Sequence, residues 1–268
     1  MAHHSLRVTA ALAFTVVLVG MDRPAHGQGP APTLTVLAKE GRRTLPLTVA
    51  NEQELLYLDD LASAFQLVVR EESLGALTVA YKGRTILLTP DQPLVSIAGR
   101  LVSLPAPATR AGRRWLVPVE FVSRALALIY DSRLELRKPS RLLIVGDLRV
   151  PRVTIRMETG DPARLIVDAT PRTTSTVSQV NSSLDITFDA DALDVAMPPL
   201  QPQGLVQAIR VMEPASVQVD LGPRFTGFRS TLQAVDASAR LTIDLAAQAD
   251  QQAGAPVAPP QALPPPDL

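Results

Sequence analysis

Apolar and polar residues alternate in short runs along most of this chain, and turn-forming residues separate the runs. The first clear run is Thr33–Leu37, and similar runs follow at 67–70, 76–80, 85–89 and 94–97. Period-two alternation is typical of β-strands that bury one face. Leu61, Ala64 and Phe65 recur instead at helical spacing, so the pattern predicts one short helix among strands, with Asp59 as its N-cap.

The same order of elements returns 60 residues further along the chain. Residues 55–65 align without a gap on 115–125, and residues 67–71 align on 127–131. An internal repeat of this kind predicts two strand–helix–strand units. We therefore expect a small α/β repeat domain over residues 33–147.

From Arg152 onward the chain has the pattern of strands without a convincing helix. The alternating runs are 153–157, 164–168, 175–180, 183–188, 205–211, 216–221, 225–228 with 230–234, and 240–245. Short strands spaced by turns predict an all-β sandwich over residues 151–246, and the fold class is thus α+β. Residues 247–268 are rich in Ala, Gln and Pro, which predicts an extended or disordered linker.

The N-terminus has the layout of a secretory signal peptide. Arg7 precedes the apolar stretch 8–21, and the small residues Ala25 and Gly27 favour cleavage after Gly27. The apolar stretch is too short to span a bilayer stably, although an uncleaved anchor stays a second interpretation. No later stretch is apolar enough for a membrane helix. We expect residues 1–27 to be removed and the protein to act in the periplasm or cell envelope.

Histidine and cysteine are missing from the predicted mature chain. The only histidines are His3, His4 and His26, and the sequence holds no cysteine. Zinc hydrolases, Ser-His-Asp hydrolases, cysteine peptidases and thiol redox proteins all need an imidazole or a thiolate. The sequence also lacks a Gly-rich phosphate loop and the G-x-S-x-G and C-x-x-C motifs. We therefore expect no enzyme activity, no cofactor and no metal in this chain.

Carboxylates are the remaining candidates for chemistry. The densest acidic cluster consists of Asp185, Asp189, Asp191 and Asp194. It lacks the central Gly and terminal Glu of an EF-hand loop. Asp59-Asp60 and Glu71-Glu72 could supply the two carboxylates of a glycosidase, but adjacent residues at a helix start or a turn point apart. Capping and solvation explain these groups better than catalysis does.

Positive charge is concentrated in the middle of the chain. Residues 100–156 carry 12 basic and 4 acidic side chains, whereas residues 157–268 carry 6 and 13. Five arginines in this band lie near one tryptophan, and the six are our candidate site residues: Arg100, Arg110, Arg113, Arg114, Trp115 and Arg124. Guanidinium groups bind carboxylates and phosphates, and an indole can stack on a sugar. The cluster predicts binding of an anionic glycan such as peptidoglycan.

Two observations favour a structural role for the same residues. Arg outnumbers Lys by 23 to 3 over the whole chain, so a group of arginines is partly a matter of composition. Trp115 aligns with Leu55 in the repeat, which is the behaviour of a core position. Nucleic acid is disfavoured as a partner by the export signal and the net charge of zero.

Two segments carry a family resemblance. The stretch Ser96-Ile-Ala-Gly-Arg-Leu-Val-Ser-Leu-Pro, together with Gly112-Arg-Arg-Trp-Leu-Val-Pro-Val-Glu-Phe-Val-Ser-Arg-Ala125, resembles the copper amine oxidase N-terminal-like domain. The hallmark of that family is a G-R-x-L-V-P strand that leads into an F-x-x-x-A-L helix. The resemblance covers residues 50–147 and implies no copper site. Residues 150–246 are similar to the AMIN domain, a β-sandwich found ahead of periplasmic N-acetylmuramoyl-L-alanine amidases and in secretins.

Two such domains followed by a Pro-rich linker resemble the front half of a secreted N-acetylmuramoyl-L-alanine amidase. In that family a zinc hydrolase domain follows the linker, and we expect this chain to be either truncated before it or a freestanding relative. The resemblance implies a non-catalytic region that binds peptidoglycan or another anionic envelope polymer and positions a linked partner. The alternative is a structural or assembly protein of an envelope complex, such as a secretin machine, whose partners are proteins.

Overall fold

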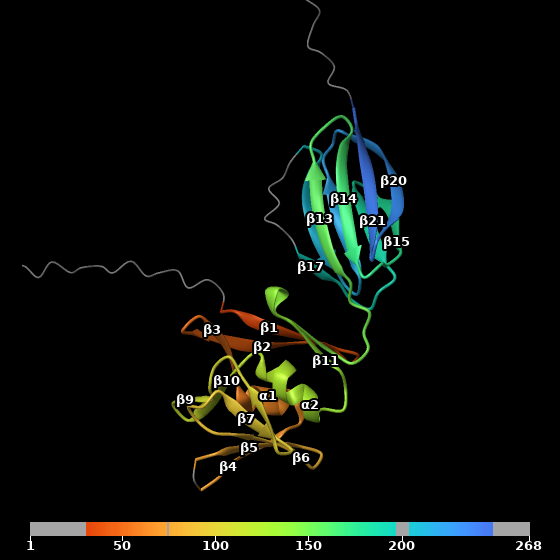
Figure 1. The fold of residues 1–268 in the computed structure, drawn as a ribbon. Helices are drawn as coiled ribbons and strands as arrows, with labels where there is room; N and C mark the ends of the chain where they lie inside the picture. Colours follow the sequence, from red (N-terminus) through yellow and green to blue (C-terminus); the bar gives the residue numbers. More distant parts are fainter. Residues whose placement is uncertain (1–30, 74, 197–203, 249–268) are drawn as a thin grey trace, which may run out of the picture. The chain divides into compact units, whose positions relative to one another are not determined.

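A computed structural model describes residues 31–73, 75–196 and 204–248 (Figure 1). Of the described residues, 59% lie in strands and 10% in helices, so the predicted strand content is confirmed and helices are a small share. The predicted signal peptide lies outside the described residues. The predicted linker also lies outside them, except for its first two residues, the first of which, Ala247, ends the last strand.

The N-terminal region, residues 33–145, contains two sheets among the described residues. The larger sheet has the order β11-β12-β1-β2-β3-β10-β9, and the smaller has the order β4-β5-β6-β7-β8. All neighbouring strands run antiparallel except β1 and β12. The larger sheet comprises β1 (Thr33–Ala38), β2 (Gly41–Ala50), β3 (Gln53–Tyr57), β9 (Thr109–Ala111), β10 (Arg114–Pro118), β11 (Leu134–Arg137) and β12 (Leu142–Val145). The smaller comprises β4 (Val68–Glu71), β5 (Leu77–Tyr81), β6 (Arg84–Leu88), β7 (Leu94–Ile97) and β8 (Arg100–Ser103).

Two helical segments lie between these two sheets (Figure 1). They are α1 (Leu58–Phe65) and a π-helical turn (Val122–Leu126) that runs directly into α2 (Ala127–Ile129). A 3-10 turn (Lys138–Ser140) connects β11 to β12. Buried side chains from both sheets, from α1 and from the second helical segment form one hydrophobic cluster. Phe121, Leu56 and Leu126 are fully buried in it, so this cluster is the core of the N-terminal region.

Helix α1 forms where the helical spacing predicts it. Leu58, Leu61 and Phe65 are buried on one face, as a three-to-four-residue period requires. The prediction that Asp59 is the N-cap is wrong: the N-cap is Tyr57, which makes no side-chain capping bond. Asp59 lies instead in the first helical turn, where its negative charge interacts favourably with the positive end of the helix dipole.

Each of the two aligned segments forms a strand followed by a helical stretch. Strands β3 and β10 pair directly, with Val117 opposite Leu56. The second unit departs from the expected strand–helix–strand order, because part of the predicted strand 127–131 is the helix α2 and the next strand begins at Leu134. Leu126 and Ile129 are both buried. Residues three apart lie on the same face of a helix, so a helical conformation lets both side chains pack into the core.

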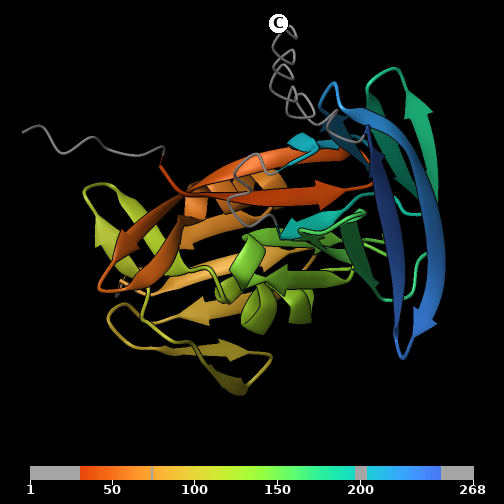
Figure 2. The same cartoon turned by 90° about the horizontal axis from the view of Figure 1, so that it is seen from above.

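The C-terminal region, residues 152–247, is built from strands alone in its described residues. One sheet has the order β17-β13-β14-β21-β20 and the other β15-β16-β19-β18. Strands β20 and β21 run side by side over their whole length (Figure 2). The first sheet comprises β13 (Arg152–Glu158), β14 (Ala163–Thr170), β17 (Asp194–Ala196), β20 (Phe225–Val235) and β21 (Ser238–Ala247). The second comprises β15 (Ser175–Val180), β16 (Ser183–Phe188), β18 (Val206–Met212) and β19 (Ser216–Leu221).

Alternation along these strands places every second side chain in a shared core. In β19 the pattern is strict, with Val217, Val219 and Leu221 buried and the residues between them half-exposed. Strands of both sheets contribute to a single cluster, so the two sheets bury their apolar faces together. A smaller cluster contains residues of β1 and β12 together with Val150 and Ala192.

Candidate binding surface and cavity

Arg110 and Trp115 of the predicted site lie together. They are direct cross-strand partners on β9 and β10, and the guanidinium carbon of Arg110 lies 5.2 Å from the centre of the Trp115 ring. Glu71 at the end of β4 joins them: Arg110 Nη1 donates to Glu71 Oε1 at 3.2 Å, and Trp115 Nε1 donates to Oε2 at 3.4 Å. The indole also packs against the core and is half-buried.

Arg114 belongs to a different cluster, although it precedes Trp115 in the sequence. Successive side chains of a strand point to opposite faces, and Arg114 lies 3.8 Å above the ring of Tyr57. Its Nε donates to Asp59 Oδ2 at 3.1 Å, and its Nη2 pairs with Asp60. Partial burial opposes the charge, but these hydrogen bonds outweigh it and raise the pKa of Arg114. This guanidinium holds the start of α1 against β10.

The other three predicted arginines lie apart from one another along the chain. Arg124, in the π-helical turn, donates from Nη1 to the backbone oxygen of Ser103 at 3.1 Å. Arg100 begins β8, and Arg113 lies in the turn between β9 and β10. Both are exposed, and neither has an ion-pair partner within the described residues. The structure therefore brings Arg110, Trp115 and the nearby turn residue Arg113 to one end of the β9–β10 hairpin. We call these three residues the hairpin surface.

Three of the aspartates between residues 185 and 194 have polar partners in this region, and Asp189 and Asp191 share Arg149. Asp185 accepts a hydrogen bond from Gln218, and Asp189 pairs with Arg149 at 3.1 Å. Asp191 accepts from the backbone N–H of Arg149 at 2.7 Å. Among the described residues no group of three His, Cys, Asp or Glu side chains is arranged to hold a metal ion. Within the same residues no helix is both long and apolar enough to cross a membrane.

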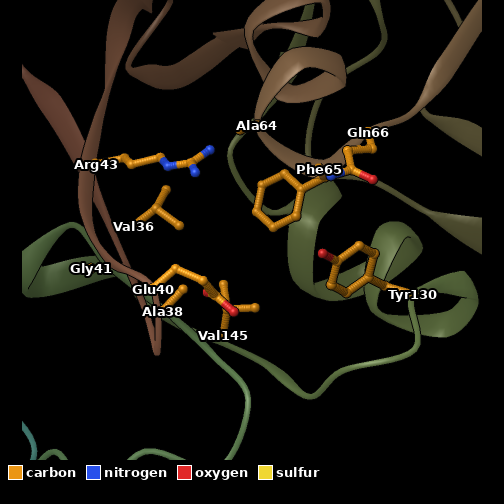
Figure 3. A pocket seen from close by; sticks show the side chains of 10 residues that line it. All are labelled: Val36, Ala38, Glu40, Gly41, Arg43, Ala64, Phe65, Gln66, Tyr130 and Val145. Carbon is orange, nitrogen blue, oxygen red and sulfur yellow. The ribbon is translucent and has the colours of Figure 1, made fainter.

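A cavity of about 260 Å³ opens beside the core of the N-terminal region (Figure 3). Its apolar wall consists of Val36, Ala38, Ala64, Phe65 and Val145. Its polar lining consists of Glu40, Arg43, Gln66 and Tyr130. Arg43 is the cross-strand partner of Val36, so it lies on the face of β2 that points toward the core. The cavity is therefore the open end of the core, between β1, β2 and β12 on one side and α1 and Tyr130 on the other.

Tyr130 forms the aromatic side of this cavity with Phe65. The two rings meet edge to face with their centres 5.3 Å apart, and Tyr81 packs behind Tyr130 at 4.6 Å. The phenol of Tyr130 points toward the interior of the cavity (Figure 3). Burial, then the neighbouring Tyr81 and then Glu40, raise its pKa above the ordinary value of 10.0. Glu40 lines the same cavity as Tyr130, so a negative charge shares the cavity with the phenol.

Arg43 and Glu40 line the same cavity without pairing. Neither side chain forms an ion pair within residues 31–73, 75–196 and 204–248, although most other charged groups of this region do. Both are exposed to solvent, whereas Val36 and Phe65 beneath them are buried. The cavity thus offers a free positive charge and a free negative charge above an apolar and aromatic floor.

These cavity residues are not among the predicted site residues. Tyr130 falls in a segment that the repeat assigned to a strand, and Glu40 and Arg43 lie outside the basic band. The one available signal was the lysine–glutamate–glycine–arginine–arginine run at 39–43, which predicts only a charged turn. Its proximity to Phe65 and Tyr130 arises from the packing of elements that are distant in the sequence, and local patterns do not show such long-range contacts.

Comparisons with known proteins identify part of the N-terminal region. Residues 35–132 match the family model of the copper amine oxidase N-terminal domain, which overlaps most of the segment 50–147 that resembles this family. The match does not extend to residues 150–246, so their AMIN-like character and the amidase context stay predictions. No curated protein matches the chain.

One solved structure is similar, the crystal structure of a hypothetical protein from Synechocystis. It has 13% sequence identity and a TM-score of 0.27, and the match covers 81% of this chain. This chain spans 35% of the length of that protein.

Proposed function

We propose that this chain is the non-catalytic binding region of an exported protein, and that its hairpin surface binds an anionic polymer of the cell envelope, with peptidoglycan as the first candidate. The observation that carries the proposal is the pairing of Arg110, on the edge strand β9, with the ring of Trp115 on β10. The matched family domain, which is non-catalytic in its family, is consistent with a binding role.

The hairpin surface has the two chemical properties that an acidic glycan requires. Trp115 is half-buried, and the part of its ring that solvent reaches would provide an apolar platform for a sugar. Arg113 provides a guanidinium without an ion-pair partner among the described residues, which can bind a carboxylate with two parallel hydrogen bonds. Arg110 is already held by Glu71 at 3.2 Å, so its role is to orient the indole and add a partial positive field.

Binding of this kind is weak at each site, and its use is to raise local concentration. A module that contacts a repetitive polymer keeps any linked or associated partner near the wall, because rebinding is favoured over escape. We propose that the β-rich C-terminal region, of AMIN type and sandwich architecture, contributes a second contact in the same way. The chain would then hold a linked or associated partner protein close to the cell wall on which that partner acts.

Co-sedimentation of the purified chain with peptidoglycan sacculi tests the proposal. Trp115→Leu keeps an apolar side chain at a position whose repeat partner is Leu55, and removes the sugar platform. Arg113→Gln removes the free charge. Arg229→Gln is the matched control, since Arg229 is an exposed arginine on β20.

We expect salt-sensitive retention of the unmodified chain and of the control, and at least about a threefold loss for each of the two hairpin variants, because each removes one modest contact. Retention that is equal for all four proteins would contradict the hairpin surface. No retention of the unmodified chain would reject polymer binding.

The alternative function, assembly with envelope proteins, is favoured by a different observation. Strand β20 is eleven residues long and ends its sheet, so one of its edges has no strand partner within the described residues. Its stretch Ser230–Ala234 is exposed and uncharged. Open edges of this kind can accept a strand from another protein. Recovery of a protein partner that is lost when a charged residue replaces Leu232 would support this alternative.

A further inference from the structure

The cavity between β1, β2, α1 and Tyr130 has features that neither polymer binding nor the family match explains. We propose that it is a binding site for a small zwitterion, an α-amino acid with an apolar side chain. Arg43 would bind the carboxylate, Glu40 the ammonium group, and the floor of Val36, Phe65 and Val145 the side chain. The proposal does not depend on binding of the envelope polymer by the hairpin surface.

The separation of the two charges is the first argument. Arg43 and Glu40 lie three residues apart at one end of the β1–β2 hairpin and line one cavity, yet no ion pair joins them to each other or to other described residues. Opposite charges that close on each other leave no room for a ligand. In Figure 3 the guanidinium of Arg43 and the carboxylate of Glu40 stand on either side of Val36 and face the aromatic wall.

The floor of the cavity is the second argument. Val36 and Phe65 are buried core residues whose upper surfaces line the cavity, so an apolar side chain placed there continues the core. The edge-to-face arrangement of Phe65 and Tyr130 presents a fixed aromatic wall. Tyr130 and Gln66 add a hydroxyl and an amide to the lining of the cavity, and both can bond to a carboxylate or an ammonium group.

Size is the third argument. Cavities that bind drug-sized molecules measure roughly 300–1,000 Å³, and this one measures about 260 Å³. It is large enough for several water molecules at about 30 Å³ each, and therefore for a single amino acid.

The ligand set L-leucine, N-acetyl-L-leucine and L-leucinamide separates the two charged contacts. Only L-leucine carries both charges, because acetylation removes the ammonium group and amidation removes the carboxylate. Isothermal titration calorimetry or NMR chemical shift mapping with these probes gives dissociation constants for the unmodified chain and for Arg43→Gln and Glu40→Gln. Arg229→Gln again serves as the matched surface control.

We expect L-leucine to bind the unmodified chain about tenfold more tightly than either blocked derivative, since each charged hydrogen bond contributes about a factor of ten or more. Arg43→Gln should weaken L-leucine and N-acetyl-L-leucine but not L-leucinamide. Glu40→Gln should weaken L-leucine and L-leucinamide but not N-acetyl-L-leucine. This crossed pattern cannot result from general destabilisation.

Two outcomes would overturn the proposal. One is the absence of saturable binding of L-leucine by the correctly folded chain at millimolar concentration. The other is binding that both variants leave unchanged. Retention on sacculi by the hairpin surface is measured in a separate experiment with Trp115→Leu and Arg113→Gln. Failure of polymer binding and failure of amino acid binding can therefore be told apart.

Discussion

The carboxylate of Asp194 accepts a hydrogen bond from Arg137 Nη1 at 3.1 Å. The side chain of Asp194 is 4% exposed and that of Arg137 is 15% exposed, which makes this the most buried ion pair among the described residues. Arg152 approaches the same carboxylate at 3.6 Å, and Glu135 holds the other side of Arg137 at 2.9 Å. Asp194, on β17, is therefore fixed by guanidinium groups from β11 and β13.

Replacement of Asp194 by Ala should destabilise the protein strongly. The substitution leaves the half-buried guanidinium of Arg137 with fewer partners, and removal of one member of a buried pair costs about 3 kcal/mol or more. Asp189→Ala is a matched control, because Asp189 pairs with an arginine at 3.1 Å but is 66% exposed. Its loss should cost about 1 kcal/mol or less. Urea unfolding followed by circular dichroism measures both, and equal values for the two variants would contradict the importance of burial.

The pair formed by Lys82 and Asp131 predicts a pH dependence in acid. A hydrogen bond from Lys82, 2.8 Å in length, lowers the pKa of Asp131 from its ordinary value of 3.8, and Arg84 contributes in the same direction. Because the pKa in the folded state lies below that of the unfolded chain, the pair stabilises the fold above pH 3.8, and this contribution disappears as the pH falls through the folded pKa.

Lys82→Met should therefore raise the pKa of Asp131 toward its ordinary value. NMR titration of the side-chain carboxyl carbon of Asp131 measures this directly. Arg84→Met should have a smaller effect in the same direction, since Arg84 is the more distant partner at 3.4 Å. A pKa of Asp131 that does not change in Lys82→Met would show that another group lowers it.

Gln66 ends helix α1 in a conformation that normally favours glycine. Its φ is 56° and its ψ is 42°, while its backbone N–H bonds to the oxygen of Ala62. The left-handed region costs a residue with a Cβ about 1 kcal/mol, and glycine avoids this cost but gains entropy in the unfolded chain. Gln66→Gly should thus stabilise the protein by up to about 1 kcal/mol, measured as a rise in the denaturation midpoint. Gln66→Val, with a branched Cβ, should lower the midpoint instead.

Local patterns predict helix α1 and the strands with clear alternation, because these elements bury residues at periods of three to four and of two residues. They do not predict β2, β9, β11 and β17. They fail where long-range contacts decide. The segment from Ala127 to Asp131 has the composition of a strand, but burial of Leu126 and Ile129 against the core makes it helical up to Ile129. The N-cap prediction fails for a similar reason, since Asp59 is bound by Arg114 from a strand 55 residues away.

The candidate site, too, depends on long-range contacts that local sequence patterns do not show. Proximity in sequence groups Arg114 with Trp115, but strand alternation separates them, and only the pairing of β9 with β10 identifies Arg110 as the partner of the indole. The cavity is the more extreme case. Glu40 and Tyr130 are far apart in the chain, and only the tertiary structure shows that they line one cavity. Composition can indicate that arginines are plentiful, but only tertiary structure shows which of them lack a partner.

Tyr130 predicts a pH dependence in alkali that reports on the cavity. Burial first, then Tyr81 and then Glu40, raise its pKa above 10.0. The folded state therefore keeps the phenolic proton at pH values where the unfolded chain has lost it. The contribution of Tyr130 to stability is present below pH 10 and is lost as the pH rises through the folded pKa. In Tyr130→Phe the free energy of unfolding should consequently fall less steeply above pH 10 than in the unmodified chain.

Glu40→Gln gives the complementary measurement. Removal of the negative charge near the phenol should lower the pKa of Tyr130, which ultraviolet absorbance of the tyrosinate detects when the titration of Tyr130→Phe is subtracted. Glu52→Gln provides a control with the same change of charge, because Glu52 lies in the β2–β3 turn and does not line the cavity. An identical titration curve for Glu40→Gln and Glu52→Gln would mean that Glu40 does not face Tyr130. The carboxylate that we propose as the partner of the ligand's ammonium group would then not face the cavity.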